Sequence, residues 1–498
     1  MFHDKAMLGA DYSASLAPMD ALQAVSLACP SHVAIFDTDV AAVPGQGTFF
    51  DEHVDFNEPE GAEFTARILA IYDEAKPKER AWKAIDLANH TIRIRKILAN
   101  GMRVHFHRKL PSVLYFRGAN SKHYRDKAGW MRHGALGDVV NVLADAGLVQ
   151  TITGGLAPNG SEKPSWASSY APTDKLIAIA VECGVSVKSA DLHYDPSELV
   201  RLFAPKATPF FDWTTGRLSQ RAKGRPIKFE PTPETQEWTA TLEAINAFYR
   251  QQDIGLGLSP DDLAHWLAVR NDDPDRKGAP YRLPELFKTD IYRVFNNGDA
   301  ANPTFDKGGR LFGGWWMSTA EDLRKAIIIN GQPTVEIDYA ECHPRMLYHR
   351  AGLDGQGELY TLPEIAAYEV ATGVKPDTYR PYIKWLMQVL INCRGRPYFV
   401  DKPERLIMPP DFTVKQIVGF IEARHQPIKE VFKTGAGLDL MRIESEIALE
   451  IVSAAMAEGW TVLSIHDSFV TSIDRLDRLK AMMIDAYVQR LGREPSFK

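Results

Sequence analysis

Apolar residues in the C-terminal part of the chain change from helix-like to strand-like spacing. Two short apolar runs, at residues 461–465 and 469–472, are separated by a polar turn, which predicts a β-hairpin with Asp467 at its tip. A further run at residues 334–339 predicts a strand that ends near Asp338. Because residues of neighbouring strands face each other across a sheet, we expect these two carboxylates to meet.

Helical spacing of apolar residues predicts several helices. One is expected over residues 79–99, with Asn100-Gly101 as its left-handed stop. Another is expected to begin at Thr232, where a capping hydroxyl precedes a proline and a glutamate. Residues 438–458 and 475–491 are expected to form two helices that flank the hairpin in sequence.

Residues 121–183 contain a helix followed by a strand–loop–strand pattern. The helix is expected to end at Gly147, and strands are expected over residues 148–153 and 166–170, joined by a loop rich in Gly, Pro, Asn and Ser. Thr173-Asp174 then caps another helix. This order resembles a winged helix, a module that often binds nucleic-acid duplexes but in many proteins only contacts other proteins.

A strongly basic segment leads into this module. Residues 93–132 contain eleven Lys or Arg against one acid, with aromatic residues interleaved. Such a segment suits phosphate contact and base stacking, and the alternative is a solvated basic face with ordinary core aromatics. Arg103, His105 and His107 are expected to alternate on one strand face. The residues of this segment that we expect to contact nucleic acid are Arg103, Arg108, Lys109 and Arg117.

Composition is that of an ordinary globular protein. The chain has 498 residues, 45% hydrophobic and 24% charged, with a net charge of −6. This length predicts roughly two to four domains. No apolar run approaches the ~20 residues of a membrane span, and the first residues lack a secretion-signal pattern. The four cysteines have no paired spacing, so neither a disulfide framework nor a zinc site is indicated, and a cytoplasmic protein without membrane contact is expected.

Four short motifs follow one another in roughly the last two-fifths of the chain. They are Lys307-Gly308-Gly309-Arg310-Leu311-Phe312, Asp338-Tyr339, Arg380 with Lys384, and His466-Asp467-Ser468-Phe469. In order and surroundings they resemble the motifs of family A DNA polymerases and phage-type single-subunit RNA polymerases. For this part of the chain the resemblance implies an α+β right-hand polymerase, with an antiparallel palm sheet and helical fingers. From the sequence pattern we expect the N-terminal part to be mostly helical and to contain the winged-helix-like module.

The resemblance implies that Asp338 and Asp467 hold two Mg²⁺ ions, with help from the carbonyl of Tyr339, and Mn²⁺ is the alternative metal. Residue chemistry agrees, because Mg²⁺ takes carboxylate oxygens together with substrate phosphates. A two-metal phosphoryl-transfer site needs its ions about 3.5–4 Å apart. The assignment therefore depends on the convergence of two residues that are distant in the sequence.

The resemblance also implies contacts with the substrates. Arg310 would contact the primer–template backbone, and His466 would position the primer end. Arg380 and Lys384 fall on one helix face, where two cations repel each other unless an anion such as an incoming triphosphate lies between them. The family's Tyr-Gly pair is replaced here by Asn392-Cys393, so the sugar and template contacts of that tyrosine do not carry over directly. Further expected contacts with nucleotide or nucleic acid are Arg345 and Asn392.

Three features bear on the choice between DNA and RNA as the product. Ser468 after the His-Asp pair is closer to the RNA polymerase version of the motif. His343, five residues after Asp338, stands where DNA polymerases of the family have a glutamate that blocks the ribose 2′-hydroxyl, and a bulky imidazole is expected to do the same. Residues 394–433 are also too few for a promoter-reading insertion. We therefore expect incorporation of deoxynucleotides.

The expected domain boundaries follow these motifs, and each of the two palm segments carries one of the aspartates. Residues 1–90 form an N-terminal region of uncertain role. The other expected parts are 91–190 for the basic winged-helix-like module, 191–300 for a helical thumb-like or linker region, 301–345 for the first part of the palm, 346–437 for the fingers and 438–498 for the second part of the palm.

The chain is thus expected to be a template-directed nucleic-acid polymerase that acts as a monomer on a DNA primer–template and nucleoside triphosphates, with RNA as an alternative partner. An RNA polymerase or primase, or a template-independent nucleotidyltransferase on the same palm, is one alternative. A different class is a non-catalytic DNA-binding replication initiator whose active part is the winged helix. A phosphohydrolase would need a nucleophile-activating histidine arrangement that the sequence does not display.

Overall fold

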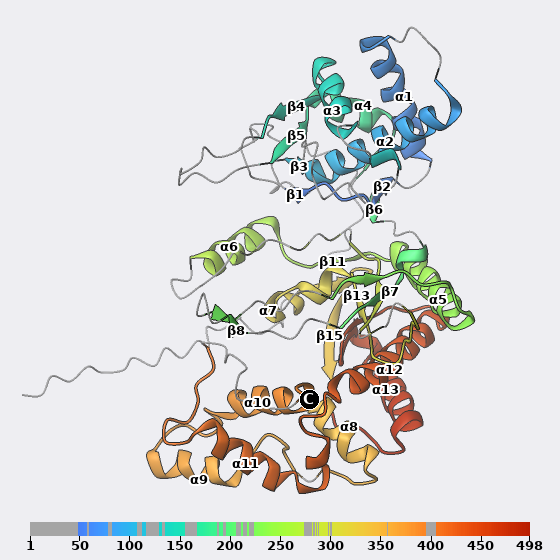
Figure 1. Cartoon of the computed structure of the whole chain (residues 1–498). Coiled ribbons are helices and arrows are strands. Elements are labelled where there is room, and N and C mark those ends of the chain that lie inside the picture. The colour runs from blue at the N-terminus through green and yellow to red at the C-terminus, as the bar shows by residue number, and fades with distance from the viewer. Residues whose placement is uncertain are drawn as a thin grey trace, which may run out of the picture. The chain divides into compact units, whose positions relative to one another are not determined.

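The computed structural model of the chain is a mixed α+β structure whose sheets are mainly antiparallel (Figure 1), which confirms the predicted α+β class. Its buried apolar side chains form two hydrophobic clusters. The structure describes residues 48–498 apart from 57–58, 78–81, 107–111, 116–128, 132–134, 155–166, 187–188, 193–195, 206–210, 213–216, 219–223, 273–280, 282–283, 285, 287, 297, 299–300, 356 and 395–404.

The first cluster collects apolar residues from the N-terminal part of the described chain, and fully buried Phe64, Ile94 and Leu143 lie in it. Burial of a side chain of this size contributes about 1.5–3 kcal/mol. The helices are α1 (Glu60–Ala75), α2 (Ala84–Phe106), α3 (Ala135–Asp145) and α4 (Asp174–Glu182), with a 3₁₀ turn at Gly129–Met131. The sheet has the order β1 (Thr48–Phe49), β3 (Val113–Tyr115), β5 (Ser168–Pro172) and β4 (Val149–Ile152). A two-stranded ladder joins β2 (Val54–Phe56) to β6 (Ala190–Leu192).

The helix predicted for residues 79–99 extends beyond its expected end. α2 continues through Asn100-Gly101 to Phe106, so the predicted stop is wrong. The reason is that Asn100 is satisfied within the helix: its Nδ2 donates to the carbonyls of Lys96 and Asp51, each at 2.9 Å. The Asn100 side chain therefore anchors a neighbouring segment and leaves the helical backbone intact.

The strand–loop–strand pattern predicted for residues 148–170 is confirmed. β4 and β5 pair antiparallel, and β5 lies between β4 and β3. Thr173 is the N-cap of α4, as predicted, and its hydroxyl accepts a hydrogen bond from Leu176 N at 3.4 Å. Residues 155–166 of the connecting loop lie outside the described part of the chain. The winged-helix assignment itself stays a prediction.

The second cluster collects apolar residues from the rest of the described chain, and two larger sheets contribute to it. One sheet has the order β10 (Pro226–Ile227), β7 (Val200–Phe203), β12 (Tyr292–Phe295) and β13 (Gly308–Phe312). The other has the order β11 (Ile254–Leu256), β14 (Ile327–Ile329), β15 (Gln332–Asp338), β17 (Ser468–Ser472) and β16 (Val462–Ile465). A short ladder joins β8 (Phe211–Asp212) to β9 (Arg217–Leu218). The region 191–300, expected to be helical, thus also supplies strands.

Helices of this part confirm several sequence predictions. The helix expected from Thr232 begins there, because the Thr232 side chain accepts a hydrogen bond from Thr235 N and proline occupies the first turn. The helices are α5 (Pro233–Arg250), α6 (Pro260–Asn271), α7 (Glu321–Arg324), α8 (Cys342–Arg350), α9 (Pro363–Thr372), α10 (Arg380–Asn392), α11 (Val414–Arg424), α12 (Gly437–Ala457) and α13 (Leu476–Leu491). Shorter 3₁₀ segments are Pro196–Glu198, Trp315–Ser318, Gln426–Val431 and Ile473–Arg475. Within the described residues no helix is long and apolar enough to cross a membrane.

The five-stranded antiparallel sheet contains both predicted aspartate-bearing segments. β16 and β17 form the predicted hairpin, and β17 pairs antiparallel with β15 so that Asp338 faces Ser468. Ile337, Leu463, Phe469 and Val470 are buried in the second cluster. The helices α12 and α13, predicted to flank the hairpin in sequence, pack against β16 and β17 respectively. Core packing therefore fixes the register on which the site depends.

Candidate active site

Asp338 and Asp467 are brought together at one end of the five-stranded sheet. Asp338 is the last residue of β15, and Asp467 lies in the turn between β16 and β17. The main-chain N–H of Tyr339 donates to the carbonyl of Asp467 at 3.2 Å. The sheet ladder thus brings together two residues far apart in the sequence, one at the end of β15 and one in the β16–β17 turn.

Two residues near the aspartates adopt an uncommon backbone conformation. His466, which directly precedes Asp467, has a φ of 61°, and Glu341, which precedes α8, has a φ of 51°. A side chain in this left-handed region costs about 1–2 kcal/mol, because Cβ crowds the carbonyl oxygen. Residues held in this way occur often where a fold positions functional groups.

The two carboxylates repel each other in a partly dry environment. Burial, followed by the charge of Asp467, raises the pKa of Asp338 to about 7, although Lys384 and Lys498 act in the opposite direction. Burial and the charge of Glu444 also raise the pKa of Asp467. Paired acids with raised pKa values in this setting favour a bound cation, which would relieve the repulsion.

Glu444 is a third acid at this site, and it is fully ionised. It lies on α12, is 3% exposed, and accepts hydrogen bonds on Oε2 from His343 Nε2 at 2.9 Å and from Arg310 Nη2 at 2.6 Å. Burial alone would raise the pKa of Glu444, but the His343 hydrogen bond and the Arg310 charge outweigh it and hold that pKa at about 2. Each hydrogen bond to a charged group contributes about 1.5–3 kcal/mol.

A glycine allows Glu444 to reach its partners. Gly309 of β13 has a φ of 85°, and a Cβ there would lie 2.8 Å from Ser445 Oγ. Only glycine therefore permits α12 to approach β13 this closely. The predicted Gly-Gly-Arg motif thus acts through packing, and it presents Arg310 to Glu444.

Several buried polar atoms around the aspartates lack a hydrogen-bond partner. Among the described residues, no partner exists for Asp338 Oδ1, Glu444 Oε1, Arg310 Nε or His466 Nδ1. Buried polar atoms in folded proteins are nearly always paired. A group of such atoms in one place marks a site where substrate groups, ions or water complete the hydrogen bonding.

The cations predicted on α10 lie on one helix face, as expected. The Arg380 guanidinium and the Lys384 ammonium lie 5.4 Å and 5.9 Å from the centre of the same ring, that of buried Tyr360. Arg380 also forms an ion pair with Glu358, so the charge of Arg380 is already balanced by a carboxylate of the same chain. Lys384 acts on Asp338, whose pKa its charge lowers.

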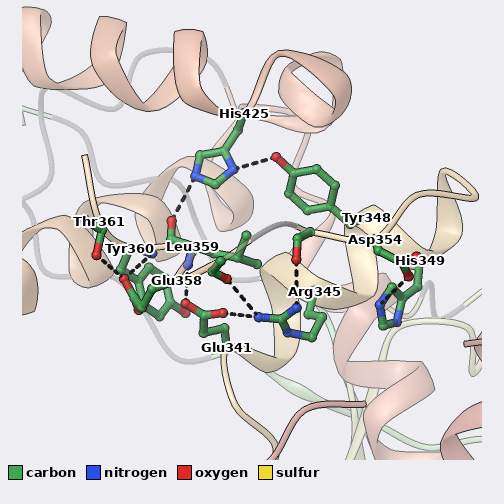
Figure 2. Close-up of polar contacts among 12 residues, drawn as sticks. Glu341, Arg345, Tyr348, His349, Asp354, Glu358, Leu359, Tyr360, Thr361 and His425 are labelled. Atoms are coloured by element: carbon green, nitrogen blue, oxygen red, sulfur yellow. Dashed lines mark hydrogen bonds and ion pairs between the residues drawn. The ribbon is translucent and has the colours of Figure 1, made fainter. Parts of the chain in front are cut away.

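Figure 2 shows the polar network around Glu358 and Glu341. The Glu358 carboxylate accepts hydrogen bonds from Tyr360 N at 3.0 Å and from the Thr361 hydroxyl at 2.7 Å. Glu341 accepts from Leu359 N and from Arg345, and burial together with the nearby Glu358 carboxyl raises the pKa of Glu341. The network fixes the loop after α8 against α10.

Arg345 makes contacts that the sequence did not predict. Its side chain is 12% exposed, pairs with Glu341 and donates to the carbonyl of Gly355 at 3.1 Å. Arg345 therefore holds the loop after α8, and its expected contact with nucleotide or nucleic acid stays a prediction. Asn392 closes α10 and donates to the Gln388 carbonyl at 2.8 Å.

Arg103 is also positioned differently from expectation. It is 3% exposed, and its Nη1 lies 3.9 Å from the Asp51 carboxylate. Because α2 continues past its expected end, Arg103 and His105 belong to a helix and the predicted strand is wrong. The Arg103 side chain is thus almost fully buried, and its expected contact with nucleic acid stays a prediction. The predicted contacts Arg108, Lys109 and Arg117, and also His107, lie outside the described residues.

A segment that the sequence did not single out lies against Asp338. Lys498 N donates to the Asp338 carbonyl at 3.0 Å, and Ala340 N donates to the Ser496 carbonyl at 2.8 Å. Phe497 lies between Ser496 and Lys498 in the sequence, and its ring stacks on the ring of Tyr339 with centroids 5.8 Å apart. The Tyr339 hydroxyl donates into the core, to Met483 O at 2.6 Å, so only its main chain is available to the site.

The oxygen donors of this site fit a hard divalent cation that also binds substrate. Asp338 and Asp467 supply carboxylates, and one Asp338 oxygen has no other partner among the described residues. No group of three or more His, Cys, Asp or Glu in that part of the chain could hold a metal by itself. Mg²⁺ is commonly bound by one or two carboxylates with water and phosphate oxygens, so two aspartates suffice.

Comparisons with known proteins add little to this geometry. No protein-family model matches the chain, and no curated protein matches it. A solved structure of the POL domain of Pol1 from M. smegmatis, in complex with DNA primer-template and dNTP, is 14% identical, with a TM-score of 0.19. The match covers 38% of this chain and 44% of that chain, so the chain spans less than half of that structure. A likeness at this TM-score carries no argument about fold or activity.

Proposed function

We propose that this protein is a template-directed nucleic-acid polymerase, a nucleotidyltransferase that synthesises DNA on a primer–template from deoxynucleoside triphosphates. The observation that carries the proposal is the convergence of Asp338 and Asp467 on neighbouring strands, close to the cation-bearing face of α10. Acids beside cations are what a triphosphate with divalent ions requires, because the acids hold the ions and the cations hold the phosphates.

The arrangement of elements supports a right-hand polymerase. The five-stranded sheet would form the palm, with contributions from residues 301–345 and 438–498, and α8 to α11 would form the fingers. The resemblance to family A and phage-type polymerases predicts the same order of elements. The order α3, β4, β5 supports a winged-helix-like module within residues 91–190 that would bind DNA.

In the proposed reaction, the primer 3′-hydroxyl attacks the α-phosphorus of the nucleotide. A phosphodiester bond forms, the bond between the α- and β-phosphates breaks, and pyrophosphate leaves with the bonding electrons. Asp338 and Asp467, with the main chain at Tyr339, would hold Mg²⁺ or Mn²⁺. The metal would lower the pKa of the primer 3′-hydroxyl, whose proton would pass to water, and would neutralise phosphate charge.

Side chains of the chain itself would orient both substrates. Arg380 and Lys384 would bind the outer phosphates, and the Lys384 ammonium would donate a proton to the leaving pyrophosphate. His466 would position the primer end beside Phe312, whose ring centroid lies 5.7 Å from that of the imidazole. Burial and the Arg310 charge lower the pKa of His466, which favours the neutral form of its ring. Arg310 would contact the primer backbone.

His343 would select the sugar of the incoming nucleotide. It lies in the first turn of α8, five residues after Asp338, and is buried. A bulky ring held at that place leaves no room for a 2′-hydroxyl, which favours deoxynucleotides. Residues that reject a hydroxyl by shape alone discriminate about 10²-fold.

The proposal is tested by primer extension with Mg²⁺, using each of the four dNTPs and four NTPs separately. Asp467→Ala should abolish incorporation and leave DNA binding largely intact, because the substitution removes a metal ligand and no DNA contact. The matched control is Asp474→Ala, an exposed aspartate of the following 3₁₀ segment, which should keep the wild-type rate. Wild-type rates in Asp467→Ala would refute the assignment.

The same assay separates the alternative functions. Synthesis without template would indicate a template-independent nucleotidyltransferase, and preferred use of NTPs would indicate an RNA polymerase or primase. Site-specific DNA binding without any Mg²⁺-dependent synthesis would indicate a non-catalytic replication initiator. The unpartnered buried atoms beside Asp338 favour a catalytic protein over that last class.

A further inference from the structure

One oxygen of Glu444 joins side chains from two other elements. His343 comes from α8 and Arg310 from β13, and both donate to Oε2 of Glu444 on α12. In the proposed function, His343 contacts the sugar and Arg310 contacts the primer strand. A single carboxylate therefore connects the two substrate-contacting side chains, although it need touch neither substrate.

Because they are buried, these side chains depend on their hydrogen bonds to one another. Glu444 and His343 are 3% and 5% exposed, so the loss of one partner would leave a buried polar group without its hydrogen bond. An ionised carboxylate accepts hydrogen bonds but cannot donate them, so the His343 nitrogen that faces Glu444 must carry a hydrogen. That hydrogen bond fixes the orientation of the imidazole ring. Without the carboxylate, the ring and the guanidinium would each lose the partner that holds it.

Atoms on the same groups remain for other partners. Among the described residues, neither Glu444 Oε1 nor Arg310 Nε has a hydrogen-bond partner, and both are buried. Glu444 thus accepts hydrogen bonds from both neighbours on one oxygen, and its other oxygen can accept a further hydrogen bond. A residue with a purely structural role would be expected to satisfy both oxygens.

We propose that Glu444 is a positioning residue for sugar selection, which holds His343 against the sugar of the incoming nucleotide and at the same time fixes Arg310. The inference rests on the proposed polymerase function. It differs from a structural role in one measurable way. A structural residue affects the rates with both sugars equally, whereas a positioning residue changes their ratio.

The test is the ratio of kcat/KM for a dNTP to that for the matching NTP, measured by primer extension. Glu444→Gln keeps the side-chain volume and removes the charge. We expect this ratio to fall about tenfold to a hundredfold, because a loosened His343 ring no longer excludes the 2′-hydroxyl. The matched control is Glu450→Gln on the same helix, which removes the partner of Arg490 and should keep the wild-type ratio.

A double variant shows whether the effect passes through His343. In a His343→Ala background, Glu444→Gln should leave the dNTP/NTP ratio unchanged, because both substitutions act on the same ring. An unchanged ratio in Glu444→Gln alone, or a further fall in the double variant, would overturn the proposal. If thermal melting finds Glu444→Gln unfolded, Glu444→Asp keeps the charge with a shorter reach, and the same fall is expected there.

Failure of this inference and failure of the proposed function give different results. A wild-type protein that extends primers, with the same sugar ratio as its folded Glu444 variant, overturns the positioning role alone. A wild-type protein that extends no primer with any nucleotide overturns both.

Discussion

The carboxyl group of Asp338 lies where its charge is unfavourable. Burial and the charge of Asp467 together move its pKa from 3.8 to about 7, and the positive charges of Lys384 and Lys498 offset this only in part. The fold tolerates the repulsion because the same two acids would hold the catalytic cations. Functional sites commonly lower the stability of the folded protein in this way.

Asp338→Asn should therefore stabilise the protein at alkaline pH. With a raised pKa, the folded state binds the Asp338 proton more tightly than the unfolded chain does. This contribution to stability is complete below about 3.8 and is lost as the pH rises through about 7. Near pH 8 the substitution should increase the free energy of unfolding by about 1–3 kcal/mol, with allowance for solvent screening.

Urea denaturation without divalent ions measures this difference. Near pH 4, where Asp338 is largely protonated in the folded protein, the stabilisation should be much smaller. An equal gain at both pH values would mean that the substitution acts through packing and not through charge. Addition of Mg²⁺ should stabilise the wild type more than the variant, because a ligand that binds only the folded state raises its stability.

At the scale of elements, the loop between α8 and α9 controls how α10 presents its cations. Glu358 of this loop pairs with Arg380, and both side chains are 37% exposed. In the proposed function, the Glu358 carboxylate would compete with an incoming triphosphate for the Arg380 guanidinium. Release of Arg380 from Glu358 is thus expected to accompany nucleotide binding.

Glu358→Gln should lower the KM for the nucleotide. Breaking an exposed ion pair costs about 0.2–1 kcal/mol, so the expected decrease in KM is about 1.4-fold to fivefold. Steady-state kinetics at saturating primer–template measures it, with Glu364→Gln, an exposed residue of α9, as the control. A higher KM in Glu358→Gln would show that Glu358 orients Arg380 productively and does not compete with the substrate.

Elements were predictable from the sequence where local pattern and core packing agree. The β16–β17 hairpin, the end of β15 and the helices α12 and α13 follow from apolar spacing. α2 was mispredicted because Asn100 bonds to a distant segment, which overrides the local stop signal. The aspartates at strand ends were likewise predictable. Glu444, Glu358 and Lys498 were not assigned, since their importance arises from contacts between segments distant in the sequence.

At the scale of the whole molecule, charge is unevenly distributed. The chain carries a net charge of −6, whereas residues 93–132 contain eleven Lys or Arg against one acid. An acidic protein that binds DNA must concentrate its cations in one place, because the phosphate backbone supplies most of the non-specific affinity. The basic segment is the strongest such concentration that the sequence analysis identified.

Replacement of Arg108, Lys109 and Arg117 together by alanine should lower the affinity for DNA. It should also make the remaining affinity less dependent on the salt concentration. Each lost phosphate contact reduces the slope of log affinity against log salt by about 0.7–0.9. The slope of the triple variant should therefore be smaller than that of the wild type by about 2–3. Fluorescence anisotropy across a salt series measures the slope. Arg475→Ala with Arg478→Ala, two exposed cations near the start of α13, should keep the wild-type slope. An unchanged slope in the triple variant would place the DNA elsewhere.

The left-handed backbone at His466 has a consequence for anyone who tries to make this protein more heat-resistant. Glycine adopts such a backbone without the Cβ penalty, so a screen that scores melting temperature alone would favour glycine at this position. A variant selected in that screen would lose the primer contact proposed for His466. A screen for heat resistance should therefore leave His466 unchanged.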